Sequence, residues 1–484
     1  MLSTDHCYRA LLSRDSRFDG KFFVGVSSTG IYCRPVCTAK TPMRTRCTFF
    51  PSAAAAEGAG FRPCLRCRPE LAPGNACVDA PRRIAHAAAS LIDDGFLEEH
   101  DLASLAARLG VTDRHLRRVF QAEFGVAPVG YAQTQRLLLA KRLLTDTTLP
   151  VTDIALASGF GSVRRFNALF QARYRMQPNR LRHEGDERNE STDGAAMRFE
   201  LAYRPPLPWD TMLAFLAQRA ILGVEAVVGA EYRRTVSLAH GGHLHRGWIA
   251  VRHAPRRAML QVSVSPDLAR VVPPVLAGVK RLFDLACDPH AVAAQLGSLA
   301  AGHPGLRVPG AFDGFEMAVR AILGQQVTVR AATTLSGRLA RTFGAALETP
   351  WAELTHAFPG PGRIAALAVA DLASQGIIAS RSRSILALAG RIADGTLVLA
   401  PGVDVDQTMA ALREVPGIGE WTAQYIAMRA LAWPDAFPHT DLGVMKALGE
   451  TAPRRVLARA EPWQPWRAYA VMHLWHLPKP KEST

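Results

Sequence analysis

Residues 412–449, LREVPGIGEWTAQYIAMRALAWPDAFPHTDLGVMKALG, decide the fold of the C-terminal half of the chain. Pro416, Gly417 and Gly419 permit a tight hairpin between two helices. The backbone N–H groups of such a turn lie at a helix N-terminus, where they can hold a phosphate without reading bases. Asp441 precedes a further helical pattern. It therefore serves as an ordinary N-cap, as a functional carboxylate, or as both.

The composition is that of a globular chain of several domains. It has 484 residues, of which 48% are hydrophobic, and a formal net charge of +15. The length predicts two to four domains, and the positive charge favours nucleic acid as a partner, unless it only reflects a genome rich in arginine codons. No apolar run approaches the ~20 residues of a membrane span, and no signal peptide is found at the start. We therefore expect a cytoplasmic protein without a membrane partner.

The cysteines are concentrated at the N-terminal end, where seven of the eight occur at or before Cys77. Two closely spaced pairs are separated by 26 residues, namely Cys33 with Cys37 and Cys64 with Cys67. Four thiolates in paired short spacings are typical of tetrahedral zinc. A closed site that only holds a small domain together is the simplest interpretation.

The remaining cysteines fall outside this spacing. We interpret Cys7, Cys47 and Cys77 as packed or free thiols, and Cys287 stands alone in the second half of the chain.

Residues 101–125 and 151–174 each predict a helix, a turn and a second helix. In the first, Gly110 ends one helix and Thr112 or Asp113 caps the next. In the second, Gly159 and Ser162 take the same places. The alternative is a plain helical bundle with a solvated arginine face. The following side chains would face DNA: Arg114, Arg117, Arg118, Arg164, Arg165 and Asn167.

The fold class is therefore multidomain and mainly α, with α+β parts. We expect a zinc domain at 1–77, a double helix-turn-helix domain at 78–184, a polar linker at 185–196, a sheet-containing subdomain at 197–287 and a helical domain at 288–484.

The first cysteine pair lies in FVGVSSTGIYCRPVC and the second in GFRPCLRC, and both segments resemble the N-terminal domain of the Ada methylphosphotriester repair proteins. The resemblance implies that Cys33 is a nucleophile that takes a methyl group irreversibly from a DNA phosphotriester. It also implies Cys33, Cys37, Cys64 and Cys67 as the zinc ligands. DNA contacts are implied for Thr29, Lys40 and Arg62.

The segment ASGFGSVRRFNALFQARYRMQPNRLR resembles AraC-type DNA-binding domains, which implies that each second helix enters a major groove.

The C-terminal half, 197–478, resembles the 3-methyladenine DNA glycosylases II of the helix-hairpin-helix superfamily. The segments that carry the resemblance are residues 412–449, FEMAVRAILGQQVTVRAATTL (315–335) and PWRAYAVMHLWH (465–476). The resemblance implies Asp441 as the catalytic carboxylate.

In this family aromatic residues line the pocket for a flipped base, and they match Trp421, Tyr425 and Trp475. Core packing would explain the tryptophans otherwise. Trp421 stands where some relatives of the superfamily carry a strand-cutting lysine, so we expect a monofunctional enzyme. The resemblance also implies Gln325 and Gln326 as pocket residues, and Gln326 stands where the family has an apolar wedge.

Together these segments predict a regulator and repair enzyme for alkylated DNA. Its partners would be double-stranded DNA, alkylated DNA and RNA polymerase at promoters, its cofactor would be zinc, and it would be a monomer. No PCHR-type motif occurs, so we expect no O6-alkylguanine transferase domain. The alternative is a zinc-containing transcription regulator whose glycosylase half binds DNA without catalysis.

Overall fold

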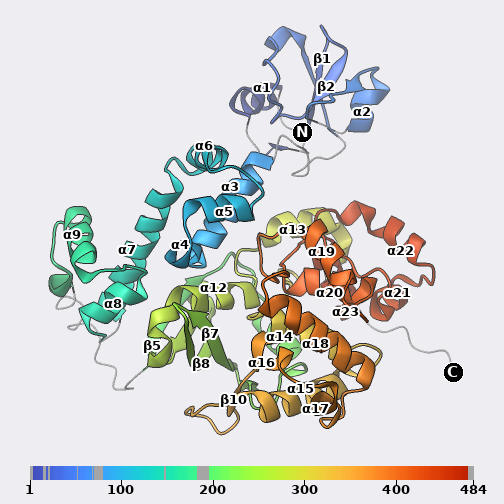
Figure 1. The fold of residues 1–484 in the computed structure, drawn as a ribbon. Coiled ribbons are helices and arrows are strands. Elements are labelled where there is room, and N and C mark those ends of the chain that lie inside the picture. The colour runs from blue at the N-terminus through green and yellow to red at the C-terminus, as the bar shows by residue number, and fades with distance from the viewer. Residues whose placement is uncertain are drawn as a thin grey trace. The chain divides into compact units, whose positions relative to one another are not determined.

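The computed structural model describes residues 4–14, 18–19, 22–51, 53–67, 69, 80–146, 149–181 and 196–477. Residues 185–195 of the predicted linker and Cys77 lie outside the described residues. The chain forms two compact units, of which the first is Met1–Ala89 with Val111–Pro128 and the second is Ser90–Gly110 with Val129–Thr484. Figure 1 labels their helices and strands. The domain limits expected from the sequence stay predictions.

The first unit is built on a small four-stranded sheet in the order β3-β1-β2-β4. Its elements are α1 (Thr4–Ser13), β1 (Phe23–Val26), β2 (Ile31–Cys33), the 3-10 helix η2 (Arg44–Arg46), β3 (Cys47–Phe50), α2 (Ala53–Gly58), β4 (Arg62–Pro63) and α6 (Asp113–Phe124). Helix α3 (Ala80–Asp93) begins in this unit and continues into the second. Phe23, Tyr32 and Ala56 are buried on one side of the sheet, and Cys7, Leu11 and Phe22 belong to a separate buried cluster.

The helix caps expected from the sequence are present. The Thr112 side chain accepts the His115 N–H at the start of α6, and Ser162 accepts the Arg165 N–H at the start of α9 (Val163–Tyr174). Gly110 has φ 67° and Gly159 has φ 75°, left-handed conformations that favour glycine. The sequence signals for two helix-turn-helix units are therefore confirmed in their local geometry.

The second unit contains the remaining elements. Its helices before the large sheet are α4 (Phe96–Glu99), α5 (Leu102–Arg108), α7 (Pro128–Asp146) and α8 (Val151–Ala157). The sheet region comprises β5 (Met197–Ala202), α11 (Trp209–Ala217), β6 (Glu225–Val228), β7 (Glu231–His240), β8 (His243–Ala254), η5 (Pro255–Arg257), β9 (Met259–Val264), η6 (Pro266–Val271) and α12 (Val272–Leu282).

The helical region that follows also belongs to this unit, and every helix in the described residues is too short or too polar to span a lipid bilayer. Its elements are α13 (Pro289–Leu296), η7 (Gly297–Ala300), α14 (Gly314–Leu323), α15 (Val329–Phe343), β10 (Ala345–Ala346), β11 (His356–Ala357), α16 (Pro361–Ala365), α17 (Val369–Ala373), α18 (Ala379–Ala393), α19 (Val405–Arg413), α20 (Glu420–Arg429), α21 (Leu442–Leu448), α22 (Pro453–Ala460), η8 (Glu461–Trp463) and α23 (Arg467–His476).

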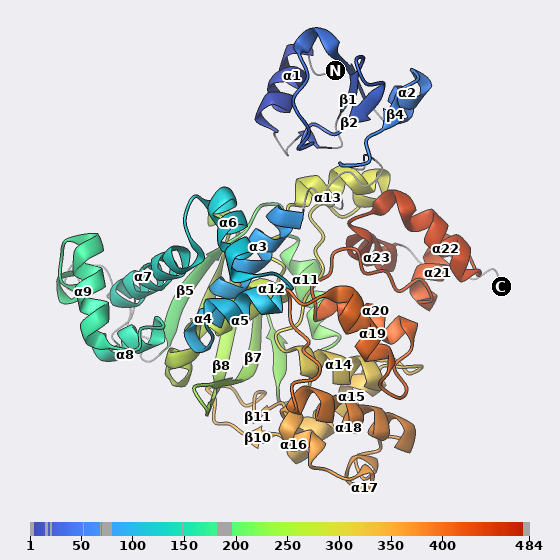
Figure 2. The ribbon, with the colours of Figure 1, turned by 45° about the horizontal axis from the view of Figure 1, so that its top comes forward.

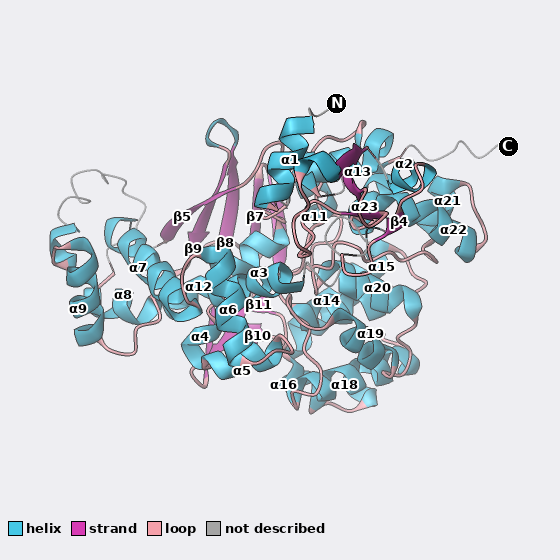
Figure 3. Ribbon diagram, turned by 90° about the horizontal axis from the view of Figure 1, so that it is seen from above, coloured by secondary structure: helices cyan, strands magenta, loops and turns pink. Residues whose placement is uncertain are grey.

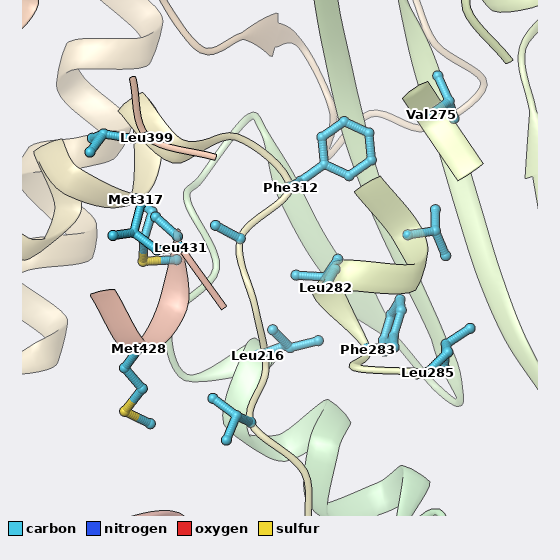
Figure 4. Close-up of a cluster of buried hydrophobic side chains, with 14 of the residues drawn as sticks. Leu216, Val275, Leu282, Phe283, Leu285, Phe312, Met317, Leu399, Met428 and Leu431 are labelled. Atoms are coloured by element: carbon cyan, nitrogen blue, oxygen red, sulfur yellow. The ribbon is translucent and has the colours of Figure 1, made fainter. Parts of the chain in front are cut away.

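The large sheet is antiparallel with strand order β5-β9-β8-β7-β6 (Figures 2 and 3). Apolar side chains alternate along β9, so that Leu260, Val262 and Val264 are buried, whereas Gln261 is exposed. This pattern is typical of a strand with one face against the core. The buried side chains continue without interruption into the helical region. Figure 4 shows Phe283, Phe312, Met317 and others gathered where the sheet region meets α14 and α20.

A buried ionic network ties the sheet to α14. Arg234 of β7 donates to Glu316 (2.7 Å), and Arg320 of α14 donates to Glu225 of β6 (2.8 Å). Tyr232 also donates its hydroxyl to Glu225 (2.6 Å). Because unpaired buried charges are costly, these pairs fix the position of α14, and hence of Gln325 directly after it.

Asp284 forms a second polar site, which is half-buried and in which its carboxylate accepts the Tyr469 hydroxyl (2.9 Å). Burial raises the pKa of Asp284 to about 7 from its ordinary 3.8. The unfolded chain releases this proton at lower pH than the folded chain. Stability therefore decreases as pH rises from about 4 to about 7.

Asp284→Asn should remove this dependence, because the amide stays neutral and tolerates the left-handed φ of 48°. We expect the variant to unfold several degrees above the parent at pH 8 and at the same temperature at pH 4. All eight tryptophans lie at or after Trp209, so tryptophan fluorescence during heating reports this half of the chain. An equal difference at both pH values would contradict the assignment.

Candidate functional site

The four paired cysteines meet at one end of the small sheet. Cys33 ends β2, and Cys64 follows β4, which pairs with β2 in parallel. Parallel neighbours end at the same edge, so the two cysteine pairs converge there. The Sγ atoms of Cys33, Cys37, Cys64 and Cys67 all lie within 4.8 Å of one another.

This arrangement fits zinc. Four sulfurs at about 2.3 Å from a tetrahedral ion lie about 3.8 Å apart, a set that the observed cluster can hold. Hydrogen bonds from the Cys33 and Cys67 thiols lower the pKa of Cys37, whereas the hydrogen bond with Cys37 raises the pKa of Cys33. Four neighbouring thiols therefore cannot all ionise unless a cation compensates them. When bound, zinc would keep each sulfur as a thiolate.

The four sulfurs are not equivalent. Cys37, Cys64 and Cys67 are buried, whereas Cys33 is partly exposed. The Arg34 N–H points at Cys67 Sγ (3.4 Å), and the Arg34 guanidinium donates to the Cys67 carbonyl (3.2 Å) and to Asp19 (2.8 Å). The predicted nucleophile Cys33 is therefore the sulfur most open to a reactant.

The other described cysteines lie outside the cluster. Cys7 is packed in a hydrophobic cluster with Phe22 and Val24, against which Cys47 also packs, and Cys287 is buried in the second unit. No disulfide joins the described cysteines, which agrees with packed or free thiols.

The residues expected to contact DNA are mostly open to solvent. Thr29, Lys40 and Arg62 are exposed in the first unit. On α6, Arg114, Arg117 and Arg118 are exposed, with Arg117 paired to Asp113 (2.9 Å).

On α9, Arg164 and Arg165 are exposed. Asn167 differs, because it is half-buried and its Oδ1 is buried without a hydrogen-bond partner. The exposed arginines suit phosphate or base contacts, and the role of each stays a prediction.

The hairpin between α19 and α20 has the predicted form. Gly417 has φ 82°, and a Cβ there would lie 2.4 Å from Ser384 Oγ, so only glycine fits. Gln325 donates to the Gly417 carbonyl (2.8 Å) and to Thr422 Oγ1 (2.9 Å). Gly419 is the N-cap residue of α20. Gln325 thus braces the turn, and its place in the base pocket stays a prediction.

Asp441 accepts hydrogen bonds on both carboxylate oxygens. Trp421 Nε1 donates to Oδ2 (2.9 Å), and Trp475 Nε1 donates to Oδ1 (2.9 Å). The Val444 N–H also donates to Oδ1 (3.0 Å), which makes Asp441 the N-cap of α21. The carboxylate is therefore held in one orientation by two indoles, from α20 and α23, and by its own helix.

An aromatic group lies beside this carboxylate. The Trp421 and Tyr425 rings are stacked with centroids 5.4 Å apart and an angle of 13°, and the Tyr425 and Trp475 centroids are 6.4 Å apart. The Arg429 guanidinium donates to the Tyr425 hydroxyl (2.8 Å). Burial opposes ionisation of Tyr425, but Arg429, Arg219 and Arg320 together lower its pKa. The structure thus brings Trp421, Tyr425, Trp475 and Asp441 together as one site.

Gln326 has φ 53°, a left-handed conformation that is uncommon for a residue with a side chain, and it is exposed. Arg381 donates to the Gln325 carbonyl just before it. Such backbone strain persists where the surroundings enforce it, and it is concentrated at functional sites.

Four family descriptions match the chain in succession. They are the metal binding domain of Ada over residues 6–70, a helix-turn-helix domain over 105–184, the AlkA N-terminal domain over 198–313, and the HhH-GPD superfamily base excision DNA repair protein over 319–455. A relative from Mycobacterium tuberculosis, named probable bifunctional transcriptional activator/DNA repair enzyme AlkA, is 39% identical over 97% of this chain and 96% of its own length.

The chain belongs to this family of bifunctional activator/repair enzymes.

Two further relatives each match a different part of this activator/repair protein. DNA-3-methyladenine glycosylase 2 of Escherichia coli is 38% identical over 57% of the chain and 96% of its own length. The activator/repair enzyme AdaA of Bacillus subtilis is 33% identical over 37% of the chain and 82% of its own length. The resemblances inferred from the sequence motifs are confirmed.

Sequence reasoning missed several residues of the activator/repair protein that position these sites. Arg34 holds the Cys67 loop, Arg429 holds Tyr425, and Arg381 holds the turn at Gln325. A buried arginine has no periodic signature. The one available signal was the position of Arg34 next to Cys33.

Proposed function

We propose that the C-terminal half excises alkylated purines such as 3-methyladenine through Asp441, and that Cys33 accepts methyl groups from DNA methylphosphotriesters. DNA is the partner of both activities. The observation that carries the proposal is the carboxylate held by Trp421 and Trp475 beside stacked aromatic rings, together with one open sulfur in a four-cysteine cluster.

The excision step needs little from the protein beyond positioning and charge. A flipped base that carries positive charge would lie against the rings of Trp421, Tyr425 and Trp475, because stacking on aromatic faces favours a cation. The bond between the base nitrogen and the sugar C1′ breaks, and its electron pair stays with the base. The Asp441 carboxylate stabilises the positive charge left on the sugar. Water then adds to C1′ and releases a proton, so no lysine is required.

Methyl transfer is a single displacement. The Cys33 sulfur forms a bond to the methyl carbon, the carbon–oxygen bond of the phosphotriester breaks, and its electron pair returns to the phosphate oxygen as an ordinary phosphodiester. Cys33 becomes a thioether, which explains why each chain would react once. The partly exposed Cys33 is the cluster sulfur with room for this approach.

The proposal includes regulation. The exposed arginines of α6 and α9 would carry the protein to a promoter, and RNA polymerase would then be recruited by a monomer of this chain. A cytoplasmic location follows from the same reasoning, because the relatives come from bacteria, whose chromosome lies in the cytoplasm.

The rival candidate is a regulator whose C-terminal half binds DNA without catalysis. One assay separates the two. Purified protein is incubated with methylated DNA, and the supernatant is analysed by chromatography for free 3-methyladenine. Release above the level of a heat-inactivated sample supports excision, and its absence with intact DNA binding favours the rival.

Gln326 should influence which opposing base is tolerated. An amide inserted into the gap left by a flipped base can hydrogen-bond the orphaned partner, whereas an apolar side chain can only stack. We expect Gln326→Leu to keep excision. The ratio between its excision rates opposite different bases should fall about tenfold, because one hydrogen bond worth about 1.4 kcal/mol is lost. Single-turnover rates on four duplexes measure this. Unchanged ratios would remove the idea.

A further inference from the structure

The hairpin that joins β7 and β8 carries three histidines on one face. His240 ends β7 and His243 begins β8, and the two are directly paired across the two-residue turn Gly241–Gly242. His245 pairs with Leu238 in the same ladder. Directly opposed residues share a face, as do residues two apart on one strand, so His240, His243 and His245 project from the same side.

The three imidazoles influence one another. The ring centroids of His240 and His245 are 6.4 Å apart. Burial lowers the pKa of His245, and the charges of His240, Arg270 and His243 lower it further. His245 is half-buried on β8, beside the His240 ring. His243 is exposed, so its side chain can turn toward the other two.

Glu99 prepares His240 for this role. Its Oε1 lies 2.9 Å from His240 Nδ1 and also accepts the Gly241 N–H (2.5 Å). A carboxylate at Nδ1 fixes the tautomer in which Nδ1 carries the proton. The lone pair that can bind a metal ion is then on Nε2. The same carboxylate–histidine pairing orients histidine ligands in metal sites.

We propose that this hairpin face binds one divalent transition-metal ion through Nε2 of His240 and the imidazoles of His243 and His245, with Glu99 as the outer partner of His240. The site is separate from the four-cysteine centre and independent of both proposed activities. Imidazole ligands select zinc, nickel or copper over magnesium and calcium.

The site closes by side-chain rotation. Among the described residues, the four cysteines alone have at least three ligand atoms already within 4.8 Å of one another, so the three rings must turn inward around the ion. Arg270 opposes a cation here, whereas Glu99 supplies the compensating negative charge. We therefore expect weaker binding than at the cysteine centre.

The test is a calorimetric titration of Zn²⁺ into the full chain, after elemental analysis has established one bound zinc per chain. The parent should take up a second equivalent, and the pair of substitutions His243→Ala and His245→Ala should abolish it. His290→Ala is the matched control, since His290 is exposed on α13 and not part of the hairpin, and it should bind like the parent. Glu99→Gln should weaken the second binding event about 10–100-fold.

Two outcomes would overturn the site. One is a parent that binds no second zinc. The other is a second equivalent that survives in the double variant. Its loss in His303→Ala would then assign it to His303 and His476, whose rings lie 5.4 Å apart. Because His243 is exposed and His245 is only half-buried at the start of β8, circular dichroism should find the double variant folded. His243→Gln alone provides a milder test if it does not.

Discussion

Replacing Asp441 with asparagine should slow base release by at least the ~10²-fold typical of losing one electrostatic stabiliser, with DNA binding nearly unchanged. Asparagine caps a helix as well as aspartate, so α21 keeps its start while the negative charge disappears. The amide offers one acceptor oxygen to two indole N–H groups, from Trp421 and Trp475, so one of these donors loses its partner.

The matched control is Asp435→Asn. Asp435 lies on the same connection between α20 and α21, and its two carboxylate oxygens accept from Arg467 (2.7 Å each). Single-turnover release of 3-methyladenine should stay close to the parent in this control. Release within tenfold of the parent in Asp441→Asn would mean that the carboxylate is mainly a cap.

Methylation of Cys33 should tighten specific DNA binding about tenfold or more. The proposed reaction would convert one of four zinc-bound thiolates into a neutral thioether, on a unit where Arg62 and Lys40 are exposed. A unit charge pair at close range is worth about 4 kcal/mol at an effective dielectric constant of ~20, less with distance and salt. A net gain of about one to three kcal/mol in binding free energy corresponds to the expected increase in affinity.

The measurement is a DNA titration of methylated and unmethylated protein at two salt concentrations, with mass spectrometry to locate the methyl group. Cys33→Ser should lose methyl transfer completely, whereas Cys47→Ser, outside the cluster, should retain it. The gain in affinity should shrink as salt rises. Equal affinities, or a methyl group on Cys37, Cys64 or Cys67, would refute the switch.

Local signals allowed much of the fold to be predicted. Thr112, Ser162, Gly110 and Gly159 mark helix boundaries through their own backbone preferences, and the structure has each as expected. The clustering of the two cysteine pairs could also be predicted, because ligand spacing along the chain is a local property.

The missing parts depend on contacts between distant residues. Trp421 and Trp475 both donate to Asp441, although they lie 20 and 34 residues from it in the sequence. No periodicity in the sequence reveals such a convergence. The bracing of Gly417 by Gln325 spans 92 residues. Gln325 was expected to line the pocket, and only the folded chain reveals that its amide supports the hairpin.

If Asp441 serves both as the cap of α21 and as the proposed catalytic carboxylate, the combination has an evolutionary consequence. A carboxylate that only performs chemistry can be lost by drift once the chemistry is no longer needed, often with a gain in stability. Here alanine would also remove the cap of α21 and cost about 1 kcal/mol. Descendants that have abandoned base excision should therefore carry asparagine or serine at this position more often than alanine.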